Sequence, residues 1–218
     1  PEKSSFKPAL KLGVLLLALA CIIIALVNPK IGTKMETVKR QGIDIVFAVD
    51  ISKSMLAEDV APNRLEKTKQ IVSQIINQLG NDRVGIVGYA GSAYPVLPMT
   101  TDYSIAKMYL QSMNTNMVSS QGTAFNDAIQ LAVDYFDVKD TSKLIILISD
   151  GEDHGEGAED AIEMAKEKGV RILTIGVGTE KGGPIPLRDD KGNIASYKKD
   201  QEGQTVTTKL YPEVLKNI

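Results

Sequence analysis

The most informative segment of this chain is Ile43-Asp44-Ile45-Val46-Phe47-Ala48-Val49-Asp50-Ile51-Ser52-Lys53-Ser54. It begins with a mainly apolar run, which is typical of a strand covered on both faces of a sheet. Asp50, Ser52 and Ser54 follow on the loop that leaves this strand, where an open α/β sheet binds its ligands. Oxygen-bearing side chains suit a hard divalent cation such as Mg²⁺ better than zinc or copper. The triplet also fits an ordinary polar turn at a strand end, so its meaning depends on the rest of the chain.

Two further polar clusters lie downstream. Gly122-Thr123 opens a predicted helix, and Ser149-Asp150-Gly151-Glu152-Asp153 closes a second apolar strand. Because loops at the carboxyl ends of neighbouring central strands converge, we expect one set of side chains to face a common point: Asp50, Ser52, Ser54, Thr123 and Asp150. These oxygens are too few to close an octahedron around a cation, so waters and an open position remain, and an external carboxylate can fill the open position. The sequence therefore predicts a Mg²⁺ site open to a partner, with Mn²⁺ or Ca²⁺ as alternatives.

The part of the chain after residue 42 alternates apolar strands with amphipathic helices. This alternation predicts a Rossmann-like, doubly wound and mostly parallel sheet with helices on both faces. The predicted strands are Asp44–Asp50, Val84–Tyr89, Leu144–Ser149 and Val170–Ile175, with Ala93–Leu97 as an edge strand because it contains Pro95. The predicted helices are one that begins at Asn63 with Glu66 as capping-box partner, then Asp102–Ser112, Thr123–Phe136 and Ala158–Lys168.

Two finer expectations concern side chains on these helices. The buried stripe of the first helix is expected to consist of Leu65, Thr68, Val72, Ile75, Ile76 and Leu79. Met108 and Met113 lie on or beside the second helix and are expected to fill the core.

Residues 179–209 interrupt the alternation with turn signals and short alternating segments. We expect a small hairpin insertion on the sheet edge. Because the insertion carries no chemical signature, a packing accessory is favoured over a functional loop.

Composition limits the function classes. A chain of 218 residues with 43% apolar residues can bury one domain-sized core and carry an attachment. The formal charge of −2 lacks the basic surface that nucleic-acid-binding proteins need, so that class is excluded. Cys21 is the sole cysteine, which excludes an intramolecular disulfide and a cysteine-rich metal site.

The first thirty residues predict a membrane helix. Leu12–Val27 contains no charged side chain, and Lys11 can reach the interface, so the usable length approaches the roughly 20 residues that a bilayer requires. A signal peptide and a lipoprotein site at Cys21 are disfavoured because Ile22-Ile23-Ile24 continue the apolar run. Lysines lie on both sides of the span, so charge alone does not orient it.

The five predicted metal ligands, in the pattern Asp-x-Ser-x-Ser, Thr and Asp-Gly, are similar to the metal-ion-dependent adhesion site of von Willebrand factor type A (VWA) domains. The resemblance extends to the bacterial aerotolerance (Bat) membrane proteins over nearly the whole chain. It is carried by Met55–Leu65, Tyr89–Tyr94, Thr100–Tyr103, Ile148–His154 and the insertion around Gly183–Leu187.

The resemblance implies a layout and partners. Residues 1–28 would be a transmembrane helix with a cytoplasmic flank, residues 29–42 a tether, and residues 43–218 a VWA domain truncated before its last helix and strand. The domain would lie in the periplasm, anchored in the lipid bilayer of the bacterial inner membrane. Family association implies companion Bat proteins and an AAA-type ATPase, and a protein partner would present an acidic side chain to the Mg²⁺.

A Mg²⁺-dependent, phosphatase-like hydrolase is the alternative, because an Asp at a strand end also opens haloacid-dehalogenase phosphatases. Those enzymes need a second Asp two residues after the nucleophile, where this chain has Ser52. A hydroxyl at that position does not act as a general acid or base at neutral pH. The sequence therefore favours a binding module without catalytic residues.

Overall fold

The computed structural model describes residues 6–27, 42–118, 124–138, 141–152, 158–189 and 191–218. The chain divides into two units, residues 1–39 and residues 40–218. The first unit contains helix α1 (Phe6–Val27). Its segment Lys7–Leu26 is long and apolar enough to cross a membrane, and none of it is buried inside protein. A helix with the length and composition of the predicted membrane span is therefore present.

The second unit is built on a five-stranded sheet of order β3-β2-β1-β4-β5. The strands are β1 (Ile43–Asp50), β2 (Arg83–Tyr89), β3 (Ala93–Thr100), β4 (Ser142–Ser149) and β5 (Val170–Gly176). Neighbouring strands run parallel except for β3, which lies at the edge antiparallel to β2. The predicted doubly wound, mostly parallel sheet is confirmed, and so is the edge position of the strand that contains Pro95.

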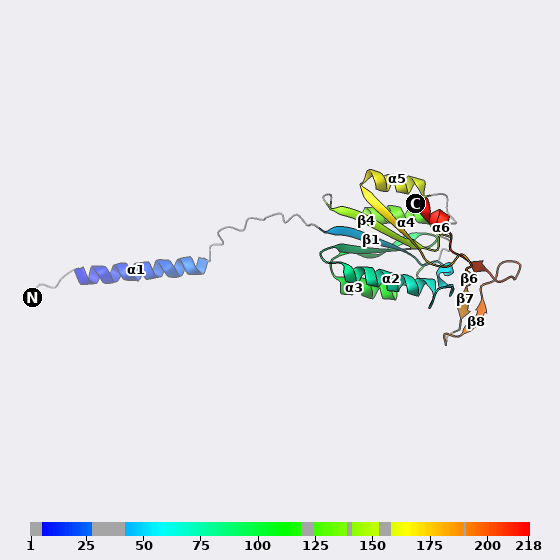
Figure 1. Ribbon diagram of the computed structural model, residues 1–218. Coiled ribbons are helices and arrows are strands. Elements are labelled where there is room, and N and C mark those ends of the chain that lie inside the picture. Colours follow the sequence, from blue (N-terminus) through cyan, green and yellow to red (C-terminus); the bar gives the residue numbers. More distant parts are fainter. Residues whose placement is uncertain (1–5, 28–41, 119–123, 139–140, 153–157, 190) are drawn as a thin grey trace, which may run out of the picture. The chain divides into compact units, whose positions relative to one another are not determined.

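Helices cover both faces of the sheet (Figure 1). One face carries α2 (Arg64–Gln78) and α3 (Tyr103–Ser112), and the other carries α4 (Phe125–Asp134), α5 (Glu159–Glu167) and the short α6 (Pro212–Lys216). Successive side chains of a strand point to opposite faces. Phe47 of β1 accordingly packs into one hydrophobic cluster, while Val46 and Ala48 pack into the other. The central strand is therefore mainly apolar, with Asp44 and Asp50 near or at its ends, because both of its faces are buried.

The start of α2 follows from its capping residue. The Asn63 side chain accepts a hydrogen bond of 2.8 Å from the Glu66 backbone N–H, which satisfies one of the free donors of the first turn. The Glu66 carboxylate accepts a hydrogen bond of 2.7 Å from Lys69 Nζ. Leu65, Thr68, Val72 and Ile76 are buried as predicted, and Ile75 and Leu79 are partly buried.

Two helix expectations need correction. α4 begins at Phe125 and ends at Asp134, so it is shorter than predicted, and Thr123 lies outside the described residues. Met108 is 61% exposed, whereas Met113 is buried. Met108 is two positions from each of the buried α3 residues Ala106 and Leu110, which places it on the opposite side of the helix.

The insertion does not extend the main sheet as expected. β6 (Gly183–Pro184) pairs with β9 (Thr207–Thr208), and β7 (Pro186–Arg188) pairs with β8 (Ile194–Tyr197), as two separate ladders. The insertion lies at the end of the sheet where the parallel strands finish (Figure 1).

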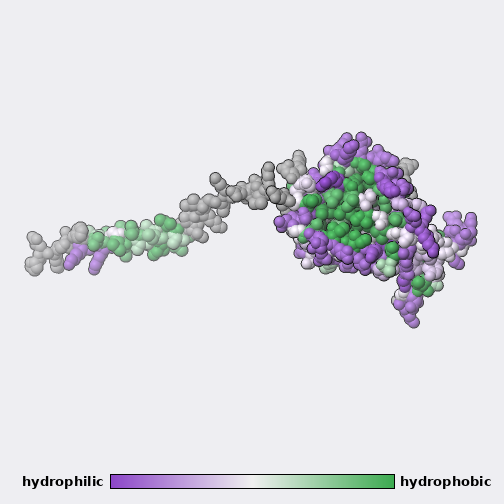
Figure 2. All heavy atoms as spheres, viewed as in Figure 1, coloured by the Kyte–Doolittle hydropathy of each residue, from purple (hydrophilic) through white to green (hydrophobic). Residues whose placement is uncertain are grey.

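β5 is the last strand of the sheet on its side, and Leu173 is 50% exposed there. Figure 2 shows apolar side chains between the two helical layers.

Candidate metal centre

Asp50 and Asp150 stand at the ends of two neighbouring strands. Asp50 is the last residue of β1, and Asp150 follows β4, which pairs with β1 in parallel register. Both side chains are fully buried. Ser149 joins the two strand ends, because its Oγ donates a hydrogen bond of 2.6 Å to Asp50 Oδ2 and accepts one of 3.0 Å from the Gly151 N–H. Two acidic side chains are thus brought to the same edge of the sheet.

The loop after β1 places two hydroxyls beside Asp50. Asp50 Oδ1 accepts a hydrogen bond of 2.8 Å from the Ser52 N–H, a local turn that Asp side chains favour. A 3₁₀ turn, η1 (Lys53–Leu56), follows directly. The Oγ atoms of Ser52 and Ser54 lie 2.8 Å apart, and both residues are buried. The structure therefore gathers the Asp-x-Ser-x-Ser side chains into one buried cluster.

Asp50 has no basic partner among the described residues, and its pKa reflects this. Burial and the charge of Asp150 raise the pKa of Asp50 to about 7, against smaller lowering effects of the Ser149 and Ser52 hydrogen bonds. Across the described part of the chain, the residues hydrogen-bonded to Asp50 are Ser149 and Ser52, neither of which is basic. Each carboxylate oxygen keeps a further lone pair for another ligand. A divalent cation would offset the repulsion between the carboxylates, so the donor set fits a hard metal ion.

Asp150 differs from Asp50 because it has an arginine partner. Arg64, at the first position of α2, donates from Nη1 to Asp150 Oδ2 at 2.6 Å, and both side chains are fully buried. The same guanidinium holds Asp59 through two hydrogen bonds, Nε to Oδ1 at 2.8 Å and Nη2 to Oδ2 at 2.9 Å. Asp150 Oδ1 accepts a hydrogen bond of 3.1 Å from the Glu152 N–H. Asp150 is therefore fixed and partly neutralised.

The insertion contacts this buried network. Arg64 donates to Thr208 Oγ1 and to the Thr208 carbonyl oxygen, each at 3.1 Å. Thr208 Oγ1 lies 3.0 Å from Glu152 Oε2, and Thr179 donates to Asp59 from its N–H at 2.7 Å. The ends of the insertion are thus bonded to the residues that hold Asp150, and the packing role favoured from the sequence stays a prediction.

The segment after the insertion crosses the loop that carries Asp150. The Tyr211 N–H donates to the Asp150 carbonyl oxygen at 2.8 Å. Gly151 adopts φ +80, and a Cβ at this position would lie 2.5 Å from the Tyr211 carbonyl oxygen. The glycine after Asp150 is therefore required both by its backbone conformation and by this close approach.

Thr123, the remaining predicted ligand, lies outside the described residues. The next residue, Ala124, donates from its N–H to the Ala90 carbonyl oxygen at 2.7 Å, directly after β2. Since β2 neighbours β1, the start of α4 is held at the same sheet edge as Asp50. No cluster of three or more His, Cys, Asp and Glu side chains suited to a metal occurs in the described ranges, so a metal here would depend on hydroxyl ligands.

Three residues around the centre were not predicted from the sequence: Asp59, Arg64 and Thr208. Ser149 was recognised as part of a polar cluster but not as the link between the two strand ends. Arg64 carried a usable signal, because a basic residue is unfavourable at a helix N-terminus and needs a nearby partner there. Thr208 carried none, since its contact with Arg64 joins residues that are 144 positions apart.

Solved structures resemble this chain closely. BatB from Bacteroides thetaiotaomicron is 42% identical, with a TM-score of 0.76, over 80% of this chain and 84% of that chain. An aerotolerance-related membrane protein from Bacteroides fragilis is 38% identical, with a TM-score of 0.75, over 80% of this chain and 85% of that chain. The resemblance to aerotolerance membrane proteins, first seen in the motifs, is thus confirmed by the structural comparison.

Curated proteins are also similar to this chain in sequence. A UPF0353 protein of Mycolicibacterium paratuberculosis is 32% identical over 194 residues, which cover 84% of this chain and 58% of that protein. The chain thus spans less than two thirds of this curated relative. The family model for the von Willebrand factor type A domain matches residues 44–201. The chain therefore belongs to the von Willebrand factor type A domain family.

Proposed function

We propose that this chain is a membrane-anchored VWA domain that binds a protein partner through Mg²⁺. The ligands would be Asp50, Ser52, Ser54, Thr123 and Asp150. The observation that carries the proposal is the charge imbalance at the sheet edge, where Asp50 and Asp150 are both buried and Arg64 is bonded to Asp150 but not to Asp50. A divalent cation would balance the remaining charge, and VWA domains generally act as interaction modules.

The chemistry of the ligands indicates what the cation would bind. A bound Mg²⁺ supplies a Lewis acid that accepts an oxygen ligand from outside the domain. Ser52 and Ser54 contribute neutral oxygens, and Arg64 withdraws part of the charge of Asp150. The residues of the chain therefore leave the site attractive to an acidic side chain of a partner.

The membrane layout and the partners are part of the same proposal. Residues 1–28 would span the bilayer with a cytoplasmic flank, and residues 43–218 would be a periplasmic VWA domain. Residues 29–42, proposed as a tether, lie outside the described residues except for residue 42. The apolar α1 and the similarity to aerotolerance-related membrane proteins support the bacterial inner membrane as its location. Companion Bat proteins and an AAA-type ATPase are the expected members of the complex.

A pull-down from solubilised membranes tests the proposal. The chain should retain a partner in Mg²⁺ and lose it in a chelator, and Asp50→Asn should behave like the chelated sample. Changing the partner's bridging acid to its amide should cost about 1.5–3 kcal/mol, the range of a charge-assisted interaction. Retention that does not depend on Mg²⁺ would contradict the cation bridge.

The hydrolase alternative is tested by measuring the hydrolysis of small phosphate substrates. A phosphatase of this kind needs a carboxyl group at position 52 for proton transfer. That position holds Ser52, whose hydroxyl is hydrogen-bonded to the Ser54 hydroxyl. We expect phosphate esters and nucleotides to be hydrolysed no faster than background in Mg²⁺. A metal-dependent rate that is abolished by Asp50→Asn would replace the binding proposal with an enzyme.

A further inference from the structure

We propose that the groove between the loop after Asp50 and the insertion holds an extended segment of the partner protein. This segment would directly adjoin the acid that binds the cation. This inference rests on the proposed function and specifies its partner. The segment would carry an apolar side chain and a second acidic side chain near the bridging acid. Nothing in the proposed metal site itself requires either of these.

The groove has a volume of about 390 Å³, within the range of ligand sites in proteins. Its lining comes from the turn after Ser52, the start of α2, the loop after α3, and β7 of the insertion. Lys53, which lines it, lies between the two serines of the proposed metal site. An extended peptide advances about 3.3 Å per residue, so the neighbours of a metal-bound acid would reach the groove.

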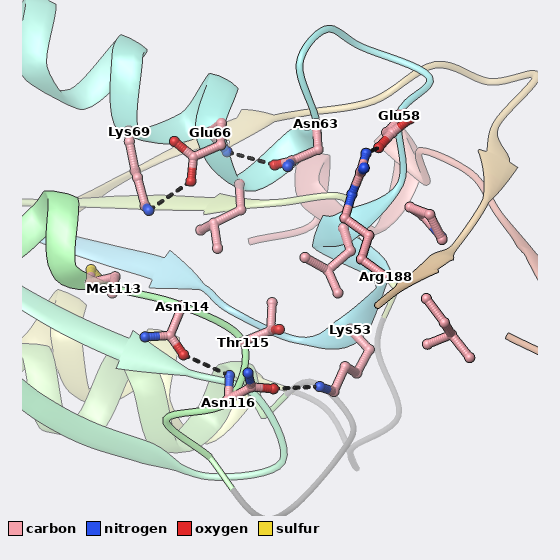
Figure 3. Close-up of a pocket in the computed structure, with 14 residues that line it drawn as sticks. Lys53, Glu58, Asn63, Glu66, Lys69, Met113, Asn114, Thr115, Asn116 and Arg188 are labelled. Atoms are coloured by element: carbon pink, nitrogen blue, oxygen red, sulfur yellow. Dashed lines mark hydrogen bonds and ion pairs between the residues drawn. The ribbon is translucent and has the colours of Figure 1, made fainter. Parts of the chain in front are cut away.

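The walls of the groove are preorganised by bonds within the domain. In the loop after α3, the Asn116 N–H donates to Asn114 Oδ1 at 3.0 Å. Lys69 Nζ of α2 donates to the carbonyl oxygen of Gln111, near the end of α3, at 3.2 Å. On the opposite side, Arg188 of β7 forms an ion pair with Glu58 (Figure 3). A rigid groove needs less ordering when a ligand binds, which favours affinity.

The charges of the groove are complementary to an acidic group. Its five charged side chains are three basic and two acidic. Glu66 is paired with Lys69 at 2.7 Å, and Glu58 is paired with Arg188. Lys53 Nζ instead donates to the neutral Asn116 Oδ1 at 2.9 Å, and no described carboxylate is paired with it (Figure 3). The third positive charge therefore remains to be balanced by the ligand.

The groove also presents apolar surface. Among the residues that line it, Leu65, Met113 and Pro186 are buried, and Leu56 is partly buried. Leu187 of β7 is 43% exposed although it lines the groove. An apolar side chain of the ligand would cover Leu187 and gain the free energy of that burial. The combination of Lys53 with Leu187 points to a peptide that carries both an acid and an apolar residue.

The insertion is held in place for this role by the buried network of the metal centre. Thr208 of β9 is bonded to Arg64, and Thr179 is bonded to Asp59. The same Arg64 holds Asp150. The wall supplied by β7 is therefore anchored, through the ends of the insertion, to a proposed ligand of the cation.

The experiment selects phage-displayed short peptides with a fixed central aspartate on the full chain in lipid nanodiscs, in Mg²⁺ and in chelator. We expect enrichment in Mg²⁺ of a second acid and of an apolar residue at constant offsets from the aspartate. Lys53→Gln should weaken the best peptide about five-fold, the size of a partly exposed ion pair. Leu187→Thr should weaken it about three-fold and remove the apolar preference.

Two matched variants control for general effects. Lys107 Nζ donates to the neutral Asn77 Oδ1 at 2.7 Å, a pairing like that of Lys53, and it lies outside the groove. Ile194 is 42% exposed on β8, which pairs with β7, and it does not line the groove. Lys107→Gln and Ile194→Thr should leave peptide binding unchanged.

The outcomes separate this inference from the proposed function. Peptides that bind only in Mg²⁺, show no residue preference beside the fixed aspartate, and bind Lys53→Gln and Leu187→Thr as well as the native chain would overturn the groove and leave the cation bridge intact. Enrichment that is lost on Leu187→Thr but does not depend on Mg²⁺ would support the groove and contradict the cation bridge. A library without any enrichment would overturn both. A concentration-dependent dimer that Leu187→Thr abolishes would assign the groove to a second copy of the chain instead.

Discussion

Arg64 Nη1 lies 2.6 Å from Asp150 Oδ2, and both side chains are fully buried. Removing one partner of such a pair leaves an uncompensated charge in the interior, which is far more costly than the pair itself is stabilising. The same guanidinium also binds Asp59 and Thr208. Arg64 is thus the residue through which the insertion, the start of α2 and the proposed metal site are connected.

Arg64→Lys should lower the free energy of unfolding by about 2 kcal/mol, because lysine keeps the charge but cannot bind Asp59 with two parallel hydrogen bonds. Chemical denaturation of the full chain measures this. Arg171→Lys on the exposed side of β5 is the control and should change stability by less than about 0.5 kcal/mol. Equal stability of both variants would show that the buried network contributes little.

Thr208→Val should lower the free energy of unfolding by about 1–2 kcal/mol, because it removes a buried hydroxyl that Arg64 and Glu152 contact while keeping the side-chain shape. The adjacent Thr207 belongs to the same strand but is exposed, so Thr207→Val should have no measurable effect. Denaturation of the two variants in parallel checks this. An equal loss in both would attribute the effect to the strand rather than to the hydroxyl.

Local signals predicted most of the fold. The apolar run before Asp50 and the cap at Asn63 depend on neighbouring residues, so the strand and the start of α2 were recognisable from the sequence. The gathering of Asp50, Ser52, Ser54 and Asp150 followed from strand order alone. The contacts of Arg64 were not predictable, because its partner Thr208 reaches it through the path of the insertion. The outward position of Met108 was missed because hydrophobicity alone does not say which side of a helix faces the core.

Asp44 gives a pH dependence that is independent of the metal centre. Burial raises the pKa of Asp44, but hydrogen bonds from Arg83 and Thr141 and the charge of Arg83 lower it more, so the pKa lies below the ordinary value of 3.8. A lowered pKa in the folded state stabilises the fold above the unfolded value, and that contribution is lost as the pH falls through the folded value. Asp44→Asn should therefore lose less stability than the native chain between about pH 5 and pH 3. Parallel stability curves from chemical denaturation would contradict this.

The orientation in the membrane is tested by cysteine labelling in a Cys21→Ser background. Lys191 is exposed in a turn of the insertion, where its N–H donates to Asp189 Oδ1 at 2.9 Å. Lys191→Cys should react with a membrane-impermeant thiol reagent on intact spheroplasts. Ser4→Cys, on the other side of the predicted span, should react only after lysis. The reverse pattern would place the domain and its partner in the cytoplasm.

Asp50→Asn should abolish Mg²⁺ binding and leave the fold intact. The apolar side chains of the strands build the core, whereas Asp50 lies at the end of β1 and bonds to the following loop. Burial and the charge of Asp150 already disfavour the ionised Asp50 carboxyl, so the amide should not destabilise the chain in chelator. At a Mg²⁺ concentration of about 100 times the dissociation constant, the native chain should gain about 2.7 kcal/mol of stability and the variant none. Calorimetric titration and thermal unfolding measure the two effects.

Two further variants decide whether this loss belongs to the proposed site. Ser52→Ala should weaken Mg²⁺ binding less than Asp50→Asn, because water replaces a neutral hydroxyl more easily than a carboxylate. Asp127 is an exposed acid in the first turn of α4, and Asp127→Asn should leave the titration unchanged. An unaltered Mg²⁺ affinity in Asp50→Asn would remove Asp50 from the ligand set and, with it, the cation bridge to a partner.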